Sequence, residues 1–323
     1  MCTAITYKTG DFYFGRTLDN DFSYGEEIVI TPRNYLNFRF RKGFHNRFAI
    51  IGTAFVNDGY PLYYDAVNEK GLCMAGLNFV GNAHYSAPSQ GKKNIAQYEF
   101  ISYILGSFSC VKEAVKEIKK INLTDESYSK SLPPAELHWI IADRNGAATV
   151  EFVKDGLRIY KNNAGVLTNN PPFDGQVFNL NNYMRLSASE IKNTFSKNLR
   201  LKNYSRGMGA LGLPGDLSSQ SRFVRAAFFR LNSVSEDGEQ ASVNQFFHIL
   251  GTVAQPRGAC RVRKDGYEIT VYSSCCNADK GIYYYTSYEN HRISAVDMHK
   301  FGLDGKKLFR TPLKSAEDIL FKN

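Results

Sequence analysis

Short apolar runs separated by turn-forming residues fill the first third of the chain. The runs at 3–7 and 12–16 flank Lys8-Thr9-Gly10-Asp11, a sequence typical of a tight turn, so we expect them to pair as a hairpin. Further strands are expected at 28–31, 48–55 and 71–79, and the last two are apolar enough to be buried. The N-terminal region is therefore predicted to form β-sheet.

Helical spacing appears beyond residue 90. The segment 109–121 places Val111, Val115, Ile118 and Ile121 on one face, and 95–105 is also amphipathic, so both are expected to be helices. Strands are expected at 137–142, 148–153, 157–160 and 165–168, with a hairpin turn at 143–146. Two helices, 219–231 and 242–250, precede strands at 269–274, 282–285 and 292–297.

This order predicts one α+β domain over residues 1–323. Strands and helices alternate in blocks, and neither a long Pro- or Ser-rich linker nor an internal repeat divides the chain. Such blocks favour packed antiparallel sheets with helices outside them. The polar segments 80–94 and 122–136 are expected to be loops.

Composition narrows the class of protein. The chain has 323 residues, 43% of them hydrophobic, but no apolar run of about 18 residues that would predict a membrane span. Its N-terminus, Met1-Cys2-Thr3-Ala4, lacks the features of a signal peptide, so we expect a cytoplasmic protein. The six cysteines are sparse and form no C-x-x-C pair, so all except Cys2 are expected to act as small buried hydrophobes.

Two common motifs give weak signals. Residues 207–212 match G-x-G-x-x-G, but a polar segment precedes them and Pro214-Gly215 follows, so a loop is expected rather than a dinucleotide site. The six histidines show no metal-ligand spacing, and His138, beside Trp139 in a predicted strand, is expected to be a core residue. Neither a metal nor an organic cofactor is predicted.

The segment 38–48 interleaves basic and aromatic residues. That pattern suits binding of single-stranded nucleic acid, by base stacking and phosphate contact. A half-buried hairpin with its basic face outward explains the same alternation. Because the net charge of +9 is not gathered into a sustained patch elsewhere, a nucleic-acid partner is the less favoured alternative.

Cys2 is the residue with the clearest chemical potential. Removal of Met1 would leave a thiol and a free α-amine on one residue, which is the arrangement of N-terminal nucleophiles. If the first two strands pair, Arg16 and Asp19 lie near Cys2. Arg16 would then favour the thiolate, and Asp19 would hold and orient the ammonium form of the amine. A surface ion pair is the ordinary alternative for an Arg and an Asp.

An ordered set of short motifs, from residue 1 to about residue 300, resembles the choloylglycine hydrolase family. The motifs are Met1-Cys2-Thr3, Phe14-Gly15-Arg16-Thr17-Leu18-Asp19, Asn68-Glu69-Lys70-Gly71-Leu72, Ala75-Gly76-Leu77-Asn78-Phe79, Leu137-His138-Trp139, Gly165-Val166-Leu167-Thr168-Asn169-Asn170-Pro171, Gly212-Leu213-Pro214-Gly215-Asp216 and Ser221-Arg222-Phe223-Val224-Arg225. The resemblance implies the four-layer αββα sandwich of N-terminal-nucleophile hydrolases and an amidase that needs no cofactor.

The resemblance also implies roles for individual residues. Cys2 is the nucleophile, and Arg16 and Asp19 support its thiol and amine. Asn169 donates to the oxyanion and Asn78 helps to build that hole, since two amide donors at a developing charge are worth several kcal/mol. Arg222, at the start of a predicted helix, completes the catalytic set.

Asn78, within Ala-Gly-Leu-Asn-Phe, favours the bile salt hydrolase branch over penicillin V acylases, which typically resemble Leu-Tyr-Tyr at that place. The implied substrate is a bile salt conjugated to glycine or taurine; a penicillin V or N-acyl-homoserine lactone acylase with the same residues is the alternative. Four apolar residues could form the walls that contact the steroid: Leu18, Phe22, Leu132 and Leu137. Ordinary packing in the protein core is the alternative explanation for them. The implied setting is a bacterial cytoplasmic enzyme, with a homotetramer expected because family members often form one.

Overall fold

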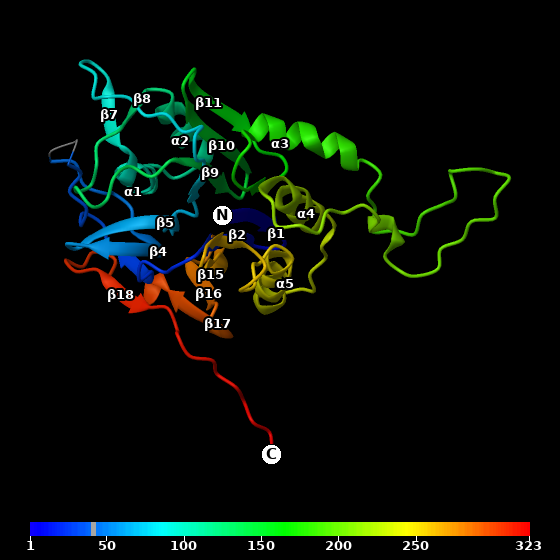
Figure 1. The fold of residues 1–323 in the computed structure, drawn as a ribbon. Coiled ribbons are helices and arrows are strands. Elements are labelled where there is room, and N and C mark those ends of the chain that lie inside the picture. Colours follow the sequence, from blue (N-terminus) through cyan, green and yellow to red (C-terminus); the bar gives the residue numbers. More distant parts are fainter. Residues whose placement is uncertain (40–42) are drawn as a thin grey trace.

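Two antiparallel sheets lie face to face in the computed structural model, which describes residues 1–39 and 43–323 (Figure 1). The first has six strands in the order β12-β1-β2-β15-β16-β17. Its strands are β1 (Cys2–Lys8), β2 (Phe12–Asn20), β12 (Val166–Leu167), β15 (Ile269–Asn277), β16 (Ile282–Ser287) and β17 (Asn290–Asp297). The predicted N-terminal hairpin is present, with β1 and β2 paired from Cys2↔Leu18 to Lys8↔Phe12.

The second sheet has eight strands in the order β11-β10-β9-β6-β5-β4-β3-β18. They are β3 (Glu27–Thr31), β4 (Ile50–Asn57), β5 (Tyr60–Asn68), β6 (Cys73–Asn78), β9 (Leu137–Asp143), β10 (Gly146–Val153), β11 (Gly156–Lys161) and β18 (Phe309–Pro312). The turn predicted at 143–146 joins β9 to β10, where Asp143 pairs with Gly146.

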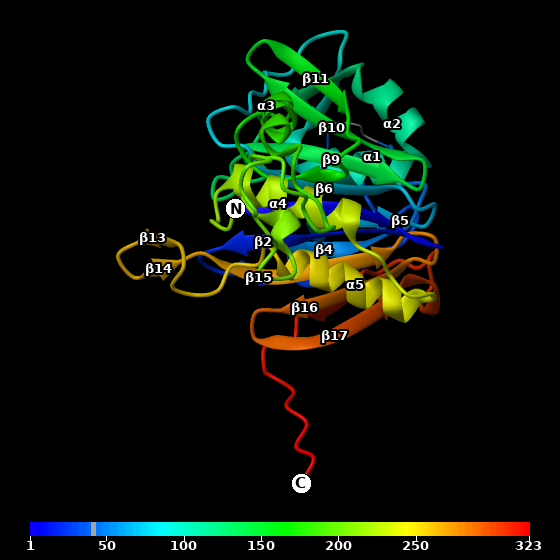
Figure 2. The same cartoon turned by 90° about the vertical axis from the view of Figure 1, so that its right-hand side faces the viewer.

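Helices cover the outer face of each sheet (Figures 1 and 2). On the eight-stranded sheet lie α1 (Phe100–Ser107), which contacts β5 and β6, and α2 (Val111–Ile118), which contacts β9 and β10. On the six-stranded sheet lie α4 (Ser219–Asn232), against β1, and α5 (Glu239–Gly251), against β15. The helix α3 (Phe173–Asn179) contacts α4. This arrangement confirms the predicted αββα sandwich.

Two buried clusters hold the layers together. One unites the inward faces of both sheets with α4 and α5, through residues such as Ile5, Ile51 and Phe246. The other joins the outer face of the eight-stranded sheet to α1 and α2, around Trp139, Phe100 and Ile118. Both faces of each sheet's centre are therefore covered, which explains why Cys275 and Cys276, neighbours on β15, are both buried.

Several local predictions were wrong. The segment predicted as a helix from residue 95 begins instead with β7 (Lys93–Ala96) and a 3-10 turn, η1 (Gln97–Glu99), before α1. Strand β7 pairs in parallel with β8 (Ile121–Thr124), which lies in a segment predicted to be loop. Strand β5, with mixed polar and apolar residues, was not predicted, nor were α3, β18 or the small hairpin β13 (Arg261–Arg263) and β14 (Gly266–Tyr267).

The basic and aromatic segment 38–48 belongs to the protein core at both ends. Phe38 is 1% exposed and Phe48 is 8% exposed, whereas residues 40–42 lie outside the described residues. The guanidinium of Arg39 lies 4.4 Å from the ring centroid of Tyr128 and donates to the Tyr128 carbonyl at 2.8 Å. In the described part of this segment, an aromatic face points inward and Arg39 serves an internal contact.

Candidate active site

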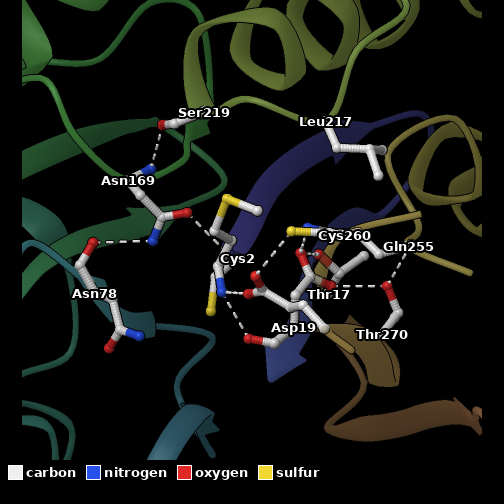
Figure 3. A network of polar contacts seen from close by, with 12 residues as sticks. Cys2, Thr17, Asp19, Asn78, Asn169, Leu217, Ser219, Gln255, Cys260 and Thr270 are labelled. Atoms are coloured by element: carbon white, nitrogen blue, oxygen red, sulfur yellow. Dashed lines mark hydrogen bonds and ion pairs between the residues drawn. The ribbon is translucent and has the colours of Figure 1, made fainter. Parts of the chain in front are cut away.

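Cys2 begins β1, and the rest of the site is built around it (Figure 3). Its side chain is 2% exposed, and its backbone nitrogen donates to Oδ1 of Asn169 at 2.8 Å. The antiparallel register places Leu18 opposite Cys2 and Arg16 opposite Ala4. The hairpin predicted from the sequence therefore brings the arginine and the cysteine together.

Arg222 reaches the same place from the first turn of α4. It is fully buried, with Nη1 donating to the Cys2 carbonyl at 2.5 Å and to Thr3 Oγ1 at 2.7 Å. Its Nη2 donates to Asn169 Oδ1 at 2.8 Å. Burial lowers the pKa of this guanidinium, against the opposing effect of Asp19 and the Cys2 thiol. Arg222 thus links the Cys2 backbone to the Asn169 side chain.

Asn169 follows the short strand β12. Its backbone nitrogen donates to Ser219 Oγ at 2.9 Å, and its Nδ2 donates to the carbonyl of Asn78 at 2.9 Å. A primary amide has two N–H donors, so this contact occupies one of them. Asn78 ends β6, and its own side chain is exposed beside the cavity described below.

Asp19 lies at the end of β2, with its carboxylate 2% exposed. Oδ1 accepts from Thr270 Oγ1 at 2.7 Å, whereas Oδ2 accepts from Gln255 Nε2 at 3.2 Å and from Thr17 Oγ1 at 3.3 Å. Its backbone pairs with Met1, whose α-amine donates to the Asp19 carbonyl at 2.7 Å. Three polar side chains therefore fix the carboxylate beside the N-terminus.

Glu268 is a member of this cluster that the sequence did not reveal. Its carboxylate, 6% exposed, forms an ion pair with the α-amine of Met1. The Sγ of Cys260 lies 3.8 Å from the same carboxylate. In the sequence Glu268 is a single acid before a predicted strand, and nothing in its neighbours marks it as part of a site.

Arg16 is held in a gap in the eight-stranded sheet. The strands β5 and β6 pair only from Val67↔Cys73 to Asp65↔Ala75, and beyond that point they separate. A bulge causes the divergence: Thr53 pairs with Asp65 and Ala54 with Tyr63, so Tyr64 has no partner on β4. Nη1 of Arg16 donates to the Tyr64 carbonyl at 3.1 Å and to the Gly76 carbonyl at 2.6 Å. Arg16 therefore satisfies a carbonyl on each separated strand.

The charge of Arg16 is balanced from several sides. Burial alone would lower its pKa, but the Cys2 thiol, Tyr272, Asp65 and Asp19 together raise it. Asp65 is 1% exposed and accepts from Tyr272 and Tyr283, each at 2.5 Å. Burial raises the pKa of Asp65, against the opposing charge of Arg16. The guanidinium is therefore charged, with the buried acid Asp65 and the Cys2 thiol both acting on it.

A cavity of about 440 Å³ extends from Cys2 through this gap. Leu18, Leu132 and Leu137, predicted as substrate contacts, all line it. Phe22, the fourth, is not among the lining residues; it is 42% exposed and packs at 4.6 Å between ring centroids against Tyr24, which does line the cavity. Among the lining residues that the sequence did not reveal, those from β5, η1 and α1 are Leu62, Tyr63, Tyr64, Gln97, Tyr98 and Ile101.

The weak motifs have structural explanations. Residues 207–212 follow no strand and contain only the 3-10 turn η3 (Met208–Ala210). His138 is fully buried, with Nδ1 3.1 Å from Glu151 Oε1 and Nε2 2.8 Å from the Thr168 carbonyl, so it is the predicted core residue. Within residues 1–39 and 43–323, we find no cluster of side chains suited to a metal ion. In the same residues, no helix has the length and apolar character to cross a membrane.

Comparisons with known proteins agree with this architecture. The chain is 54% identical over 316 residues to a bile salt hydrolase/transferase from Lactiplantibacillus plantarum, covering 98% of each chain. It is 37% identical to the C2A mutant of conjugated bile acid hydrolase from Clostridium perfringens, whose crystal structure superposes with a TM-score of 0.92 over 100% of each chain.

A penicillin V acylase structure from Agrobacterium tumefaciens, 19% identical, shares the fold with a TM-score of 0.76 over 96% of this chain and 90% of that one. Residues 2–310 match the family described as linear amide C–N hydrolases, choloylglycine hydrolase family. Because that match spans nearly the whole chain and the relatives are similar from end to end, the protein belongs to the choloylglycine hydrolase family.

Proposed function

We propose that this enzyme hydrolyses the amide bond of bile salts conjugated to glycine or taurine, with Cys2 as the nucleophile. The observation that carries the proposal is one constellation: a buried N-terminal cysteine beside Arg16, Asn169 and Arg222, at one end of a cavity lined largely by apolar and aromatic side chains. Such a cavity suits a large apolar acyl group with a single reactive carbonyl.

Catalysis begins after removal of Met1, which frees the Cys2 α-amine. The α-amine takes the proton of the Cys2 thiol and becomes an ammonium, and the positive charge of Arg16 stabilises the resulting thiolate. The thiolate attacks the substrate carbonyl carbon to form a C–S bond while the C=O π electrons move onto oxygen. The second N–H of Asn169 Nδ2, oriented by the contact with the Asn78 carbonyl, donates to the resulting oxyanion. The exposed amide of Asn78 supplies a second donor at the mouth of the cavity.

Collapse of the tetrahedral intermediate breaks the C–N bond. The Cys2 ammonium gives a proton to the leaving amino group, so glycine or taurine departs and a thioester remains. Asn169 Oδ1, which accepts from the Cys2 nitrogen at 2.8 Å, orients that amine, and Asp19 supports its charge. A water molecule then attacks the thioester with the amine as base, which releases the bile acid and restores the thiol.

Similarity supports bile salts over penicillin V as substrates. A penicillin V acylase from Pectobacterium atrosepticum is 26% identical over 78% of this chain, well below the relative from L. plantarum. The deciding experiment compares glycine release from glycocholate, measured with ninhydrin, with phenoxyacetate release from penicillin V. Preferential cleavage of glycocholate by protein shown by intact mass to begin at Cys2 is the expected result. Preferential cleavage of penicillin V, or full activity with Met1 retained, would contradict the proposal.

A second candidate activity is transfer of the acyl group to an amine, because the relative from L. plantarum is named a hydrolase/transferase. Glu268 favours it, because its buried carboxylate pairs with the Met1 α-amine and, once Met1 is removed, is left beside Cys2 to bind the ammonium group of an amine acceptor. Mass spectrometry of products formed with an added amino acid would detect the new amide. A Glu268→Gln variant is expected to lower the ratio of transfer to hydrolysis.

Self-association and location complete the proposal. The segment 184–211 projects from the body (Figure 1) and exposes seven large apolar side chains, Met184, Ile191, Phe195, Leu199, Leu201, Tyr204 and Leu211, each at least 40% accessible. Such a surface supports a homotetramer, which light scattering of wild type and a variant shortened in this segment would test. All six cysteines are free, which supports a reducing bacterial cytoplasm.

A further inference from the structure

The deep wall of the cavity contains a buried hydrogen-bond donor that no described residue uses. Trp139 lines the cavity and is fully buried, and its Nε1 has no hydrogen-bond partner in the described part of the chain. Buried donors are satisfied in most native structures, because an unpaired one costs about 1–3 kcal/mol. An unsatisfied donor in a ligand cavity therefore calls for a partner on the ligand.

The indole cannot turn to find a partner elsewhere. The Trp139 ring packs edge-on against Phe100, with 4.9 Å between centroids, and against Phe152, with 6.0 Å. Tyr85 lies at 6.3 Å on a further side. Because these rings fix the plane of the indole, the direction of its N–H bond is set by packing rather than by hydrogen bonding.

The opposite strand presents a glycine to this N–H group. Gly76 on β6 pairs with Trp139 on β9, and a Cβ atom placed on Gly76 would lie 3.1 Å from Nε1. Gly76 and Leu137 also line the cavity. Because Gly76 has no Cβ, its position on β6 adds no side chain over the indole nitrogen on this side of the cavity wall.

The position along the strands relates this donor to the reacting carbonyl. The Gly76↔Trp139 pair lies two residues from the Asn78↔Leu137 pair, which corresponds to about 7 Å at the rise of a β-strand. The Asn78 carbonyl holds Asn169, the proposed oxyanion donor. At that distance, a donor on Trp139 would meet a part of the acyl group beyond the scissile carbonyl.

We infer that Trp139 is a specificity-determining residue whose indole N–H donates a hydrogen bond to a hydroxyl oxygen on the ring system of the bound acyl group. This inference rests on the proposed function, because hydroxyl groups are the polar groups that a bile acid carries on its rings. The surrounding wall, formed by Leu62, Ile101 and Leu137, holds the hydrocarbon surface. Trp139 thus selects hydroxylated acyl groups over unhydroxylated ones.

The test compares two glycine conjugates, one of a trihydroxylated bile acid (glycocholate) and one of 5β-cholanic acid, which has no ring hydroxyl. Trp139→Phe is expected to lower the ratio of their kcat/KM values about tenfold, equivalent to about 1.4 kcal/mol. The lost ring volume affects both substrates, so the ratio of their kcat/KM values reports the loss of the hydrogen bond from the Trp139 indole N–H. Leu62→Ala, which trims an apolar wall, is the matched control and is expected to leave the ratio within about twofold, a difference under 0.5 kcal/mol.

Trp139 is the chain's only tryptophan, which provides two further measurements. Growth of a tryptophan auxotroph on 3-benzothienylalanine replaces the indole N–H by sulfur with little change of shape, and the same fall in the ratio is expected even if Trp139→Phe folds poorly. In the Cys2→Ala variant, the fluorescence of Trp139 is expected to change more with glycocholate than with the unhydroxylated conjugate.

The outcomes separate this inference from the proposed function. Wild-type turnover of both conjugates, with an unchanged ratio in the analogue-labelled enzyme, would overturn the inference and leave the function standing. That unchanged ratio is expected if the indole N–H of Trp139 donates only to water. No glycine release from either conjugate by the wild type would overturn the function and this inference with it.

Discussion

The two sheets differ most where they face each other at the nucleophile. In the six-stranded sheet β1 and β2 pair without interruption over seven residue pairs, from Cys2↔Leu18 to Lys8↔Phe12. In the eight-stranded sheet β5 and β6 pair over three and then separate at the Tyr64 bulge. One sheet presents the nucleophile on a continuous ladder, and the other provides the gap that admits the acyl group.

Gly15 and Gly76 illustrate this difference between the two sheets. A Cβ on Gly15 of β2 would lie 1.9 Å from the backbone carbonyl oxygen of Ser274, so this position requires glycine for the close approach of β15. A Cβ on Gly76 of β6 would meet side chains of the cavity wall, the nearest at 3.1 Å. At these two positions, close backbone approach and space for the ligand fall in different sheets, so each can be perturbed separately.

Substitution of the nucleophile is expected to have the largest effect. Cys2→Ala should reduce turnover by about 10⁴-fold or more, as loss of a nucleophile typically does, and Cys2→Ser should rescue little because an alkoxide forms much less readily than a thiolate. Cys110→Ala is the control and should retain activity. Steady-state kinetics measures turnover in each variant, and the rate of inactivation by iodoacetamide reports the reactive thiol. Normal turnover in a folded Cys2→Ala protein would refute the assignment of Cys2 as the nucleophile.

Loss of the proposed oxyanion donor is expected to come next. Asn169→Ala should lower kcat by about 10²–10³, or roughly 3–4 kcal/mol, with a smaller change in KM, because an oxyanion exists only in the transition state. Asn170→Ala removes a neighbouring amide that donates to the Val80 carbonyl, and serves as the control. If Asn169→Ala keeps kcat within about threefold of wild type, a loss under 1 kcal/mol, the oxyanion role is wrong.

In the continuous sheet, Gly15→Ala is expected to damage the fold itself. The added methyl group overlaps the backbone of β15, so we expect a loss of about 3 kcal/mol in the free energy of unfolding and a fall in Tm of roughly 5–10 °C. A thermal melt checks this. A Tm equal to that of the wild type would show that β15 can shift to accommodate the methyl group without loss of stability.

At the gap, Gly76→Ala is expected to act on the ligand instead. The methyl group narrows the cavity between Leu137 and Trp139, so KM for a conjugated bile salt should rise about tenfold, or about 1.4 kcal/mol, while the melt changes little. Steady-state kinetics with a small acyl substrate is the control, since that acyl group does not reach Gly76. An equal loss with both substrates would contradict a purely steric role.

The smallest expected effect concerns acid stability at the start of α4. Hydrogen bonds from Ser218 and Ser221 lower the pKa of Asp216 from 3.8 to about 2. Because the folded-state value lies below the unfolded one, this stabilisation is present above about pH 4 and is lost as the pH falls toward 2. Asp216→Asn should therefore flatten the pH dependence of unfolding in that window, whereas Asp155→Asn, at an exposed turn, should preserve it. Acid titrations followed by circular dichroism make the comparison.

Short-range pairing is the part of the site that the sequence was sufficient to predict. The Lys8–Asp11 turn predicted the hairpin, and the register of that hairpin is what places Arg16 and Asp19 near Cys2. The family motifs supplied Asn78, Asn169 and Arg222, which the fold brings together although they are distant in the chain. The helices predicted at 219–231 and 242–250 correspond to α4 and α5.

The remaining features depend on long-range packing that a local pattern does not encode. Strand β5 mixes polar and apolar residues and lacks the alternation of an ordinary strand. Its bulge at Tyr64 and the gap beside it accommodate Arg16, which is a long-range contact. Glu268 and Asp65 are single acids whose partners lie more than 200 residues away. Phe22 has the right hydrophobicity for a cavity wall, but the chain turns it outward against Tyr24.

Met1 has a consequence for how the protein is made. It extends the β1–β2 ladder by one residue, donating to the Asp19 carbonyl at 2.7 Å and accepting from the Asp19 nitrogen at 2.9 Å. Because Met1 continues the existing ladder, a chain that keeps Met1 and a processed chain are expected to share this fold, and only the processed chain carries the Cys2 α-amine that the proposed mechanism uses. A spectroscopic check of the fold would therefore not distinguish the two forms, whereas an intact-mass measurement would.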